Sequence, residues 1–139
     1  MEDSETRILI QQAIEAKNRA YAPYSNFRVG AALLTDKDQM FQGCNIENIS
    51  FSPTVCAERT AIFSAIVQGN NKFKAIAIAS DDVQFSSPCG VCRQVLSEFV
   101  SQDFIIILIN SSNQSKKMRF QDFFPLPFSP SKSIGKKKT

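Results

Sequence analysis

Six apolar residues in a row, Phe104 to Ile109, constrain the fold of this chain more than any other sequence feature. A run of this length fits a β-strand and is too short to span a membrane. A strand that is apolar on both faces must be covered on both faces, so helices are expected above and below its sheet. The run therefore predicts an α/β fold in which a sheet lies between two helical layers.

The other periodic segments alternate between strand and helix patterns. Apolar residues recur at helical spacing in three segments, and short apolar stretches bounded by polar residues indicate three further strands. The expected helices are residues 4–20, 56–68 and 89–100, and the expected strands are residues 27–34, 39–46, 73–79 and 104–109. From Pro125 onward, repeated prolines predict an irregular segment. Together these patterns indicate a three-layer α/β/α sandwich.

A length of 139 residues is typical of one domain, which we expect to span residues 1–130. Four of the 16 Lys and Arg residues lie after residue 131, so residues 1–131 carry 12 basic against 13 acidic residues. We therefore expect residues 131–139 to form a flexible, lysine-rich tail. A body with this balance lacks the basic footprint of a protein that binds nucleic-acid polymers.

The N-terminal sequence Met-Glu-Asp-Ser-Glu-Thr is acidic and leads into a helical pattern, unlike the basic and then apolar start of a secretory signal. We therefore expect a cytoplasmic protein that does not insert into membranes. Four cysteines in a reducing compartment are poor candidates for disulfides, so metal or redox chemistry is the better explanation for them.

Three of the cysteines lie at the starts of two expected helices, in Cys56-Ala-Glu58 and Pro88-Cys89-Gly-Val-Cys92. Cys89 and Cys92 are three residues apart on one helix face, so both sulfurs can reach one ion. Helix N-termini favour thiolate over thiol, and Cys56 supplies a third ligand. Three protein ligands leave a tetrahedral Zn²⁺ one open position, which is the arrangement of a catalytic site with one zinc per chain.

Two other interpretations of these cysteines remain open from the sequence. Cys44 would be the fourth ligand of a closed, structural zinc site, although its strand pattern is more typical of a small buried side chain. Cys89 and Cys92 alone would form a dithiol redox pair, which leaves Cys56 without a role. A zinc-stabilised binding module without catalytic activity is the corresponding alternative at the level of function.

The chain contains no histidine, so a proton carrier must come from Glu, Asp, Lys, Tyr or Cys. Glu58, two residues after Cys56, lies close enough to a metal to move protons without binding the ion. Arg59 can reach a ligand sulfur and offset the negative charge that three thiolates bring to Zn²⁺. The plainer alternatives are an acid that only favours the helix dipole and a solvated arginine.

A ligand-x-Glu sequence followed by Pro-Cys-x-x-Cys is the signature of zinc deaminases that act on nucleobases. The chain has the all-cysteine form of this signature, at residues 54–61 and 87–94, and resembles the small homotetrameric cytidine deaminases. The resemblance extends to two further segments, Ala20-Tyr-Ala-Pro-Tyr-Ser-Asn-Phe-Arg-Val-Gly30 and Gly43-Cys-Asn-Ile-Glu-Asn48. The resemblance implies a mixed five-stranded sheet. It also implies hydrolytic deamination of cytidine and 2′-deoxycytidine to uridine and 2′-deoxyuridine, a reaction of pyrimidine salvage.

The same resemblance implies which residues surround a nucleoside. Asn45 and Glu47 would bind the ribose hydroxyls, for which an amide beside a carboxylate offers both a donor and an acceptor. Phe27 would pack against the pyrimidine, and Ala57 would join the substrate-binding set. Glu58 would pass protons from water to the base and to the departing amine.

Further residues are assigned by resemblance beyond this set. Gln94 would orient Glu58, and Phe128 would reach the site of a neighbouring subunit. Phe51 stands where the family often has tyrosine, so a hydroxyl contact there is absent. A homotetramer is expected mainly from the resemblance and partly from a dense apolar group in a segment with little structure of its own, namely Phe123, Phe124 and Phe128.

Two rival enzyme classes share the zinc signature. A deaminase for another aminopyrimidine nucleoside, of the blasticidin type, is disfavoured by Asn45-Ile-Glu47. A polynucleotide-editing deaminase would show a basic channel and usually a histidine ligand, and the sequence indicates neither.

Overall fold

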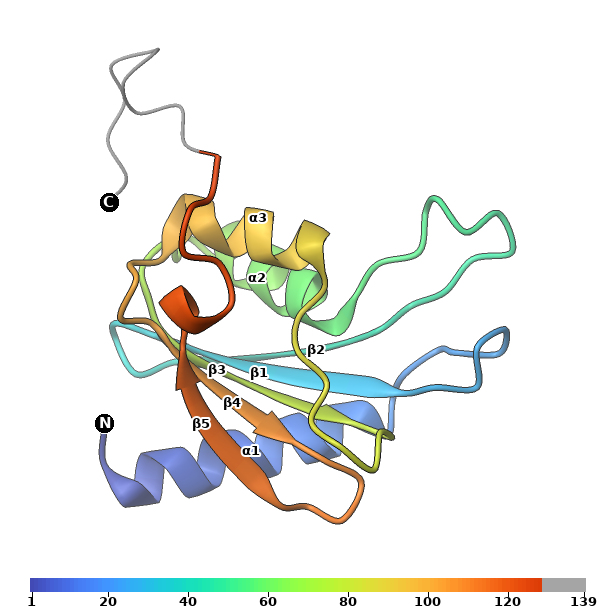
Figure 1. The fold of residues 1–139 in the computed structure, drawn as a ribbon, viewed down its shortest axis with the longest axis horizontal. Coiled ribbons are helices and arrows are strands. Elements are labelled where there is room, and N and C mark those ends of the chain that lie inside the picture. Colours follow the sequence, from blue (N-terminus) through green and yellow to red (C-terminus); the bar gives the residue numbers. More distant parts are fainter. Residues whose placement is uncertain (129–139) are drawn as a thin grey trace.

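The computed structural model describes residues 1–128, so the tail expected at residues 131–139 lies outside the described part of the chain. Figure 1 shows one sheet with helices on both of its faces. The strands are β1 (Val29–Thr35), β2 (Met40–Cys44), β3 (Phe73–Ser80), β4 (Ile105–Ile109) and β5 (Ser115–Arg119). The helices are α1 (Asp3–Lys17), α2 (Ala57–Val67) and α3 (Gly90–Phe99), and a single 3-10 turn, Phe120–Asp122, follows β5.

The sheet is mixed and has the order β2-β1-β3-β4-β5. β1 pairs antiparallel with both β2 and β3, whereas β3 and β4 run parallel. β5 returns antiparallel along the outer side of β4. Parallel neighbours need a crossover connection, which α3 provides between β3 and β4. The mixed five-stranded sheet implied by the resemblance is confirmed.

Two apolar cores lie on opposite faces of this sheet. The larger core lies between the sheet and the pair α2 and α3, and the smaller one lies between the sheet and α1. Alternate residues of β4 enter the two cores, because successive side chains of a strand point to opposite faces. The all-apolar run at residues 104–109 is therefore buried on both sides, and the three-layer α/β/α sandwich is confirmed (Figure 1).

The element that the sequence pattern did not locate is β5. Its sequence, Ser-Lys-Lys-Met-Arg, contains one apolar residue and is largely exposed, because β5 is an edge strand. Charged edge strands discourage pairing with other chains, which explains the composition. The seven elements that were located begin and end within three residues of their expected bounds.

The C-terminal phenylalanines behave differently from the sequence-based expectation. Phe123 and Phe124 are half-buried and pack against the larger core, so the apolar group that partly supports the expected homotetramer is in part covered within the chain itself. Phe128 fits the expectation, since 76% of its surface is exposed. Within residues 1–128, no helix is both long enough and apolar enough to cross a membrane.

Two glycines bring helices into direct contact with the sheet. A Cβ atom at Gly43 in β2 would overlap the backbone of Ala57 and Ala61 in α2. A Cβ at Gly30 in β1 would likewise overlap the backbone at the end of α1. The absence of a side chain at Gly43 therefore fixes the first turn of α2 against the strand that leads to Asn45.

Candidate active site

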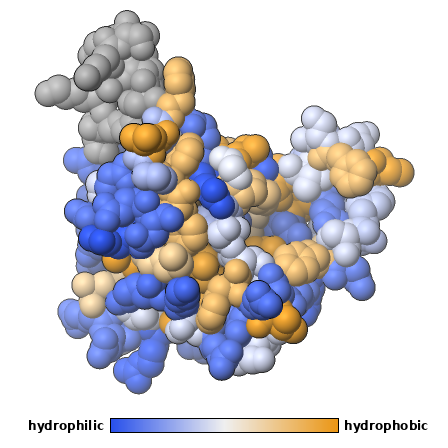
Figure 2. Space-filling model, in the orientation of Figure 1, coloured by the Kyte–Doolittle hydropathy of each residue, from blue (hydrophilic) through white to orange (hydrophobic). Residues whose placement is uncertain are grey.

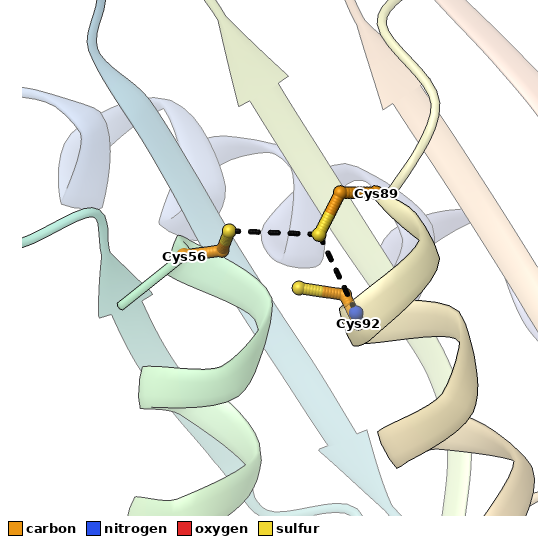
Figure 3. Close-up of side chains that lie close together, drawn as sticks. All are labelled: Cys56, Cys89 and Cys92. Atoms are coloured by element: carbon orange, nitrogen blue, oxygen red, sulfur yellow. Dashed lines mark hydrogen bonds between the residues drawn. The ribbon is translucent and has the colours of Figure 1, made fainter. Parts of the chain in front are cut away.

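The three cysteines expected to bind metal come together where α2 and α3 begin, with their sulfurs pointing toward one another (Figure 3). Cys56 and Cys89 are the N-cap residues of the two helices, and Cys92 lies in the first turn of α3. The Sγ atoms of Cys56 and Cys89 are 3.7 Å apart, and all three sulfurs lie within 4.8 Å of one another. In residues 1–128 this is the one group of three metal-ligating side chains gathered so closely.

The surroundings of the sulfurs favour negative charge. Arg59 Nη2 donates to Cys56 Sγ at 3.4 Å, and the backbone N–H of Cys92 donates to Cys89 Sγ at 3.4 Å. Hydrogen bonds from the Cys92 thiol and from Arg59 lower the pKa of Cys56 to about 5. The contact with Cys56 and burial raise the pKa of Cys92. The cluster thus holds one thiolate easily and resists further ionisation, which a bound cation would relieve.

The donor set fits Zn²⁺. Tetrahedral Zn–S bonds of about 2.3 Å place sulfurs roughly 3.8 Å apart, close to the 3.7 Å between Cys56 and Cys89. Cys44, the fourth ligand of the closed-site alternative, lies apart from the cluster, and its Sγ donates to the Arg19 carbonyl at 3.5 Å. The redox-pair alternative omits Cys56, whose sulfur is an integral part of the group.

Glu58 lies in the first turn of α2 and is buried, with 5% of its surface exposed. Burial, and then the negative charge of Cys56, raises the pKa of Glu58 to about 7. A carboxyl group that titrates near neutral pH can both accept and release a proton during a reaction. The side chain therefore has the properties of a proton carrier beside the cysteine cluster.

A cavity of about 540 Å³ connects these groups with the residues expected to bind a sugar. Its volume is typical of a site for a small molecule. Apolar surface is supplied by Phe27, Val29 and Ile78, among others. The polar side chains on its wall include Cys56, Glu58, Cys89, Asn45, Glu47 and Ser25.

Asn45 and Glu47 are held by the loop that follows α1, together with the first residue of β1. The side-chain amide of Asn45 accepts from the backbone N–H of Val29 and donates to the Phe27 carbonyl, each at 2.9 Å. Glu47 Oε1 accepts from the backbone N–H groups of Tyr24 at 2.9 Å and Ser25 at 3.1 Å. The hydrogen bonds from Ser25, side chain first, lower the pKa of Glu47. An amide and an ionised carboxylate thus stand side by side in the cavity wall.

The family model for the "Cytidine and deoxycytidylate deaminase zinc-binding region" matches residues 3–108. The chain belongs to this deaminase family. A cytidine deaminase of Sporosarcina psychrophila is 43% identical over 121 residues, which cover 87% of this chain and 89% of that protein. A probable cytidine deaminase of Dictyostelium discoideum is 39% identical over 137 residues, covering 98% of this chain and 92% of the relative.

Solved structures agree with this family membership. The crystal structure of cytidine deaminase from Burkholderia pseudomallei superimposes with a TM-score of 0.85 at 41% identity, and covers 92% of this chain and 100% of its own. The cytidine deaminase from Mycobacterium tuberculosis gives a TM-score of 0.79 at 33% identity, with 93% of this chain and 99% of that one covered.

In this deaminase, a charged network anchors the loop that carries Phe27. Asp81, just after β3, accepts from the Arg28 backbone N–H at 2.8 Å and from its Nε and Nη2 at 3.0 Å. Lys17 at the end of α1 adds an ion pair at 3.2 Å. The hydrogen bonds from Arg28 lower the pKa of Asp81 to about 2, so the carboxylate stays ionised at neutral pH.

The loop before Cys89 is fixed from α3. Arg93 donates from Nε to the Pro88 carbonyl at 2.8 Å and from Nη2 to the Ser87 hydroxyl at 3.1 Å. Its Nη1 also reaches the Phe123 carbonyl at 3.5 Å. One guanidinium therefore ties the metal-ligand loop to the C-terminal segment.

Of the remaining predicted residues, some line the cavity and the others lie outside it. Phe27 and Ala57 line the cavity, as a substrate-binding role requires. Gln94 Nε2 donates to the Phe128 carbonyl at 3.2 Å, so the orientation of Glu58 by Gln94 stays a prediction. Phe51, in the loop between β2 and α2, is 79% exposed and has a positive φ of 60°.

Several cavity residues were not singled out from the sequence. Ser25, Thr54, Ser86 and Ser87 all contribute to the wall. Ser25 and Ser87 belong to the motifs Ala-Pro-Tyr-Ser and Ser-Pro-Cys, so their place beside recognised residues was a usable signal. Thr54 begins the segment at residues 54–61 and offers the same signal, whereas Ser86 lies in a loop whose polar composition gives no such indication.

We predict that protein purified under reducing conditions contains one zinc per chain. Cys89→Ser should lower the affinity for zinc at least about 100-fold, because it removes a thiolate ligand. Cys44→Ser is the matched control and should retain one zinc, since its sulfur lies outside the cluster. Metal analysis decides the matter. A value near zero or two for the unmodified chain, or loss of zinc in Cys44→Ser, would contradict the assignment.

Proposed function

We propose that this chain is a zinc-dependent cytidine deaminase, which hydrolyses cytidine and 2′-deoxycytidine to the corresponding uridines and ammonia. The observation that carries the proposal is the buried Glu58, with a pKa raised to about 7, beside three gathered thiols, two of which line the same cavity as Glu58. A metal-dependent hydrolase needs both a site for a Lewis acid and a proton carrier that works at neutral pH. A binding module would need neither.

Cys56, Cys89 and Cys92 would hold the zinc, which supplies the Lewis acidity that activates water for attack on C4 of the base. Glu58 takes a proton from the water and delivers it to N3 of the pyrimidine. After attack, Glu58 takes the second proton from the new hydroxyl on C4 and passes it to the amine, so that the C4–N bond breaks, the C4 carbonyl forms and ammonia leaves. Arg59 contributes by donating to Cys56 Sγ, which reduces the negative charge that the sulfurs share.

The sugar-binding part of the proposal concerns Asn45 and Glu47. A ribose hydroxyl is both a donor and an acceptor, and the two side chains supply the two complements within one cavity wall. Phe27 offers an aromatic surface for the pyrimidine, and Ala57 contributes to the same wall. Recognition of the sugar would distinguish a free nucleoside from free cytosine.

We further propose a homotetramer in which Phe128 enters a neighbouring subunit's site. Figure 2 shows apolar side chains over the projecting loop between β2 and α2 and near the C-terminal segment. Apolar residues of α2, α3 and these segments are exposed, including Phe51, Phe63, Val67, Val91, Leu126 and Phe128. An exposed apolar surface of this kind is typical of subunit interfaces.

The cellular role that we propose is pyrimidine salvage in the cytoplasm. A salvage enzyme must accept free nucleosides, for which the polar wall formed by Asn45 and Glu47 is suited. Reducing conditions would keep the three ligand thiols available for zinc.

Replacement of Glu58 tests the mechanism. Glu58→Gln should retain zinc but lower kcat by about 10²- to 10⁴-fold, because the amide cannot transfer protons. Glu98→Gln changes an exposed acid on α3 and should leave kcat within about twofold. Ammonia release and zinc content are measured on the same samples. A near-normal kcat for Glu58→Gln would show that this residue is only a helix acid.

Substrate comparison tests the assignment of the substrate class. The kcat/KM values for cytidine and 2′-deoxycytidine should exceed that for cytosine by more than about 100-fold, because cytosine leaves the sugar-binding groups unpaired. A short cytosine-containing oligonucleotide should not react. A relative from Bacillus cereus, 31% identical over 128 residues, is named a blasticidin-S deaminase. Blasticidin S turned over in preference to cytidine would therefore move the chain to that rival class.

The molecular mass in solution tests the tetramer. Light scattering combined with size-exclusion chromatography should give four times the mass of the chain at micromolar concentration. A fully active monomer would contradict a site shared between subunits.

A further inference from the structure

We infer that Ser25 is a positioning residue, whose hydroxyl holds the Glu47 carboxylate in place to accept the sugar 3′-hydroxyl. The inference rests on the proposed function and adds a residue to it. Ser25 lies in the loop between α1 and β1, on the cavity wall beside Glu47. The two residues are 22 positions apart in sequence, and their contact exists only in the folded chain.

The Ser25 side chain makes a hydrogen bond in each direction. Its Oγ accepts from the backbone N–H of Phe27 at 3.1 Å and donates to Glu47 Oε2. The Phe27 carbonyl is also near, at 3.4 Å, but a hydroxyl has one proton, and the closer Glu47 oxygen takes it. The hydroxyl therefore links the loop that carries Phe27 directly to the carboxylate.

Three donors consequently fix the Glu47 carboxylate. The backbone N–H groups of Tyr24 and Ser25 bind Oε1, and the Ser25 hydroxyl binds Oε2. A carboxylate can accept about four hydrogen bonds, so roughly one position remains for a donor in the cavity. The backbone donors alone hold a single oxygen. The Ser25 hydroxyl adds the second point and thereby prevents rotation of the carboxylate about its own axis.

The division of roles follows from these contacts. The Ser25 proton is used by Glu47, so Ser25 acts on the substrate through Glu47 rather than by direct contact. Its effect should appear only with substrates that offer a 3′-hydroxyl. A serine that merely maintained the loop would instead affect all substrates equally, because the same loop positions Phe27.

The test compares cytidine with 2′,3′-dideoxycytidine, which lacks the 2′- and 3′-hydroxyls and keeps the 5′-hydroxyl. Ser25→Ala should lower kcat/KM for cytidine about tenfold, mainly through KM, and change kcat/KM for dideoxycytidine by less than about twofold. Ser25→Thr keeps the hydroxyl and should restore the value for cytidine. Ser101→Ala, an exposed serine before β4 and outside this cavity, is the matched control and should behave like the unmodified chain.

A double-mutant comparison completes the experiment. In a Glu47→Ala background, Ser25→Ala should lower kcat/KM for cytidine by no more than about twofold further, because the partner is already absent. Equal losses with cytidine and dideoxycytidine, no loss at all, or independent effects of the two substitutions would each overturn the inference. If the unmodified, zinc-loaded chain does not deaminate cytidine, the proposed function fails instead. If Ser25→Ala does not fold, Ser25→Cys, of similar size and a weaker donor, should show the same selective loss for cytidine.

Discussion

The rest of the site depends on the mutual repulsion of three thiols, which must lose their protons to bind a metal ion. Their sulfurs lie within 4.8 Å of one another, and the first ionisation makes the next more difficult. The fold opposes this repulsion with the N-terminal ends of two helices and with the guanidinium of Arg59. The arrangement requires α2 and α3 to begin at the same place on one face of the sheet. The order of the central strands, in which β3 and β4 are joined by α3, provides that meeting point.

The wall of the cavity depends on a second set of fixed contacts. Asn45 binds both the N–H of Val29 and the carbonyl of Phe27, and Asp81 binds Arg28 between them. The loop before β1 therefore has little freedom relative to the end of β2. A site formed by loops can hold a precise geometry when backbone groups, rather than long side chains alone, supply the hydrogen bonds.

The sequence predicted the elements that the core requires. Residues 104–109 predict a strand buried on both faces, and the spacing of Cys89 and Cys92 predicts two ligands on one helix turn. The sequence pattern did not predict β5, because an edge strand such as Ser-Lys-Lys-Met-Arg needs no apolar pattern when its neighbour supplies the hydrogen bonds. The role of Ser25 was not predicted for a different reason. Its partner is 22 residues away, and nothing in either local pattern specifies that the two loops meet. Phe123 and Phe124 similarly depend on where the chain returns after β5.

Gly43 gives the site a property that no polar residue could provide. Because the backbones of β2 and α2 touch at this position, the helix cannot slide along the strand. The strand leads to Asn45 and Glu47, and the helix begins after Cys56. The spacing between the segment that carries Asn45 and Glu47 and the sulfur of Cys56 is thus set by main-chain contact. Substitutions of side chains in the cavity wall can therefore change which molecule fits this chain while the main-chain spacing beneath them stays constant.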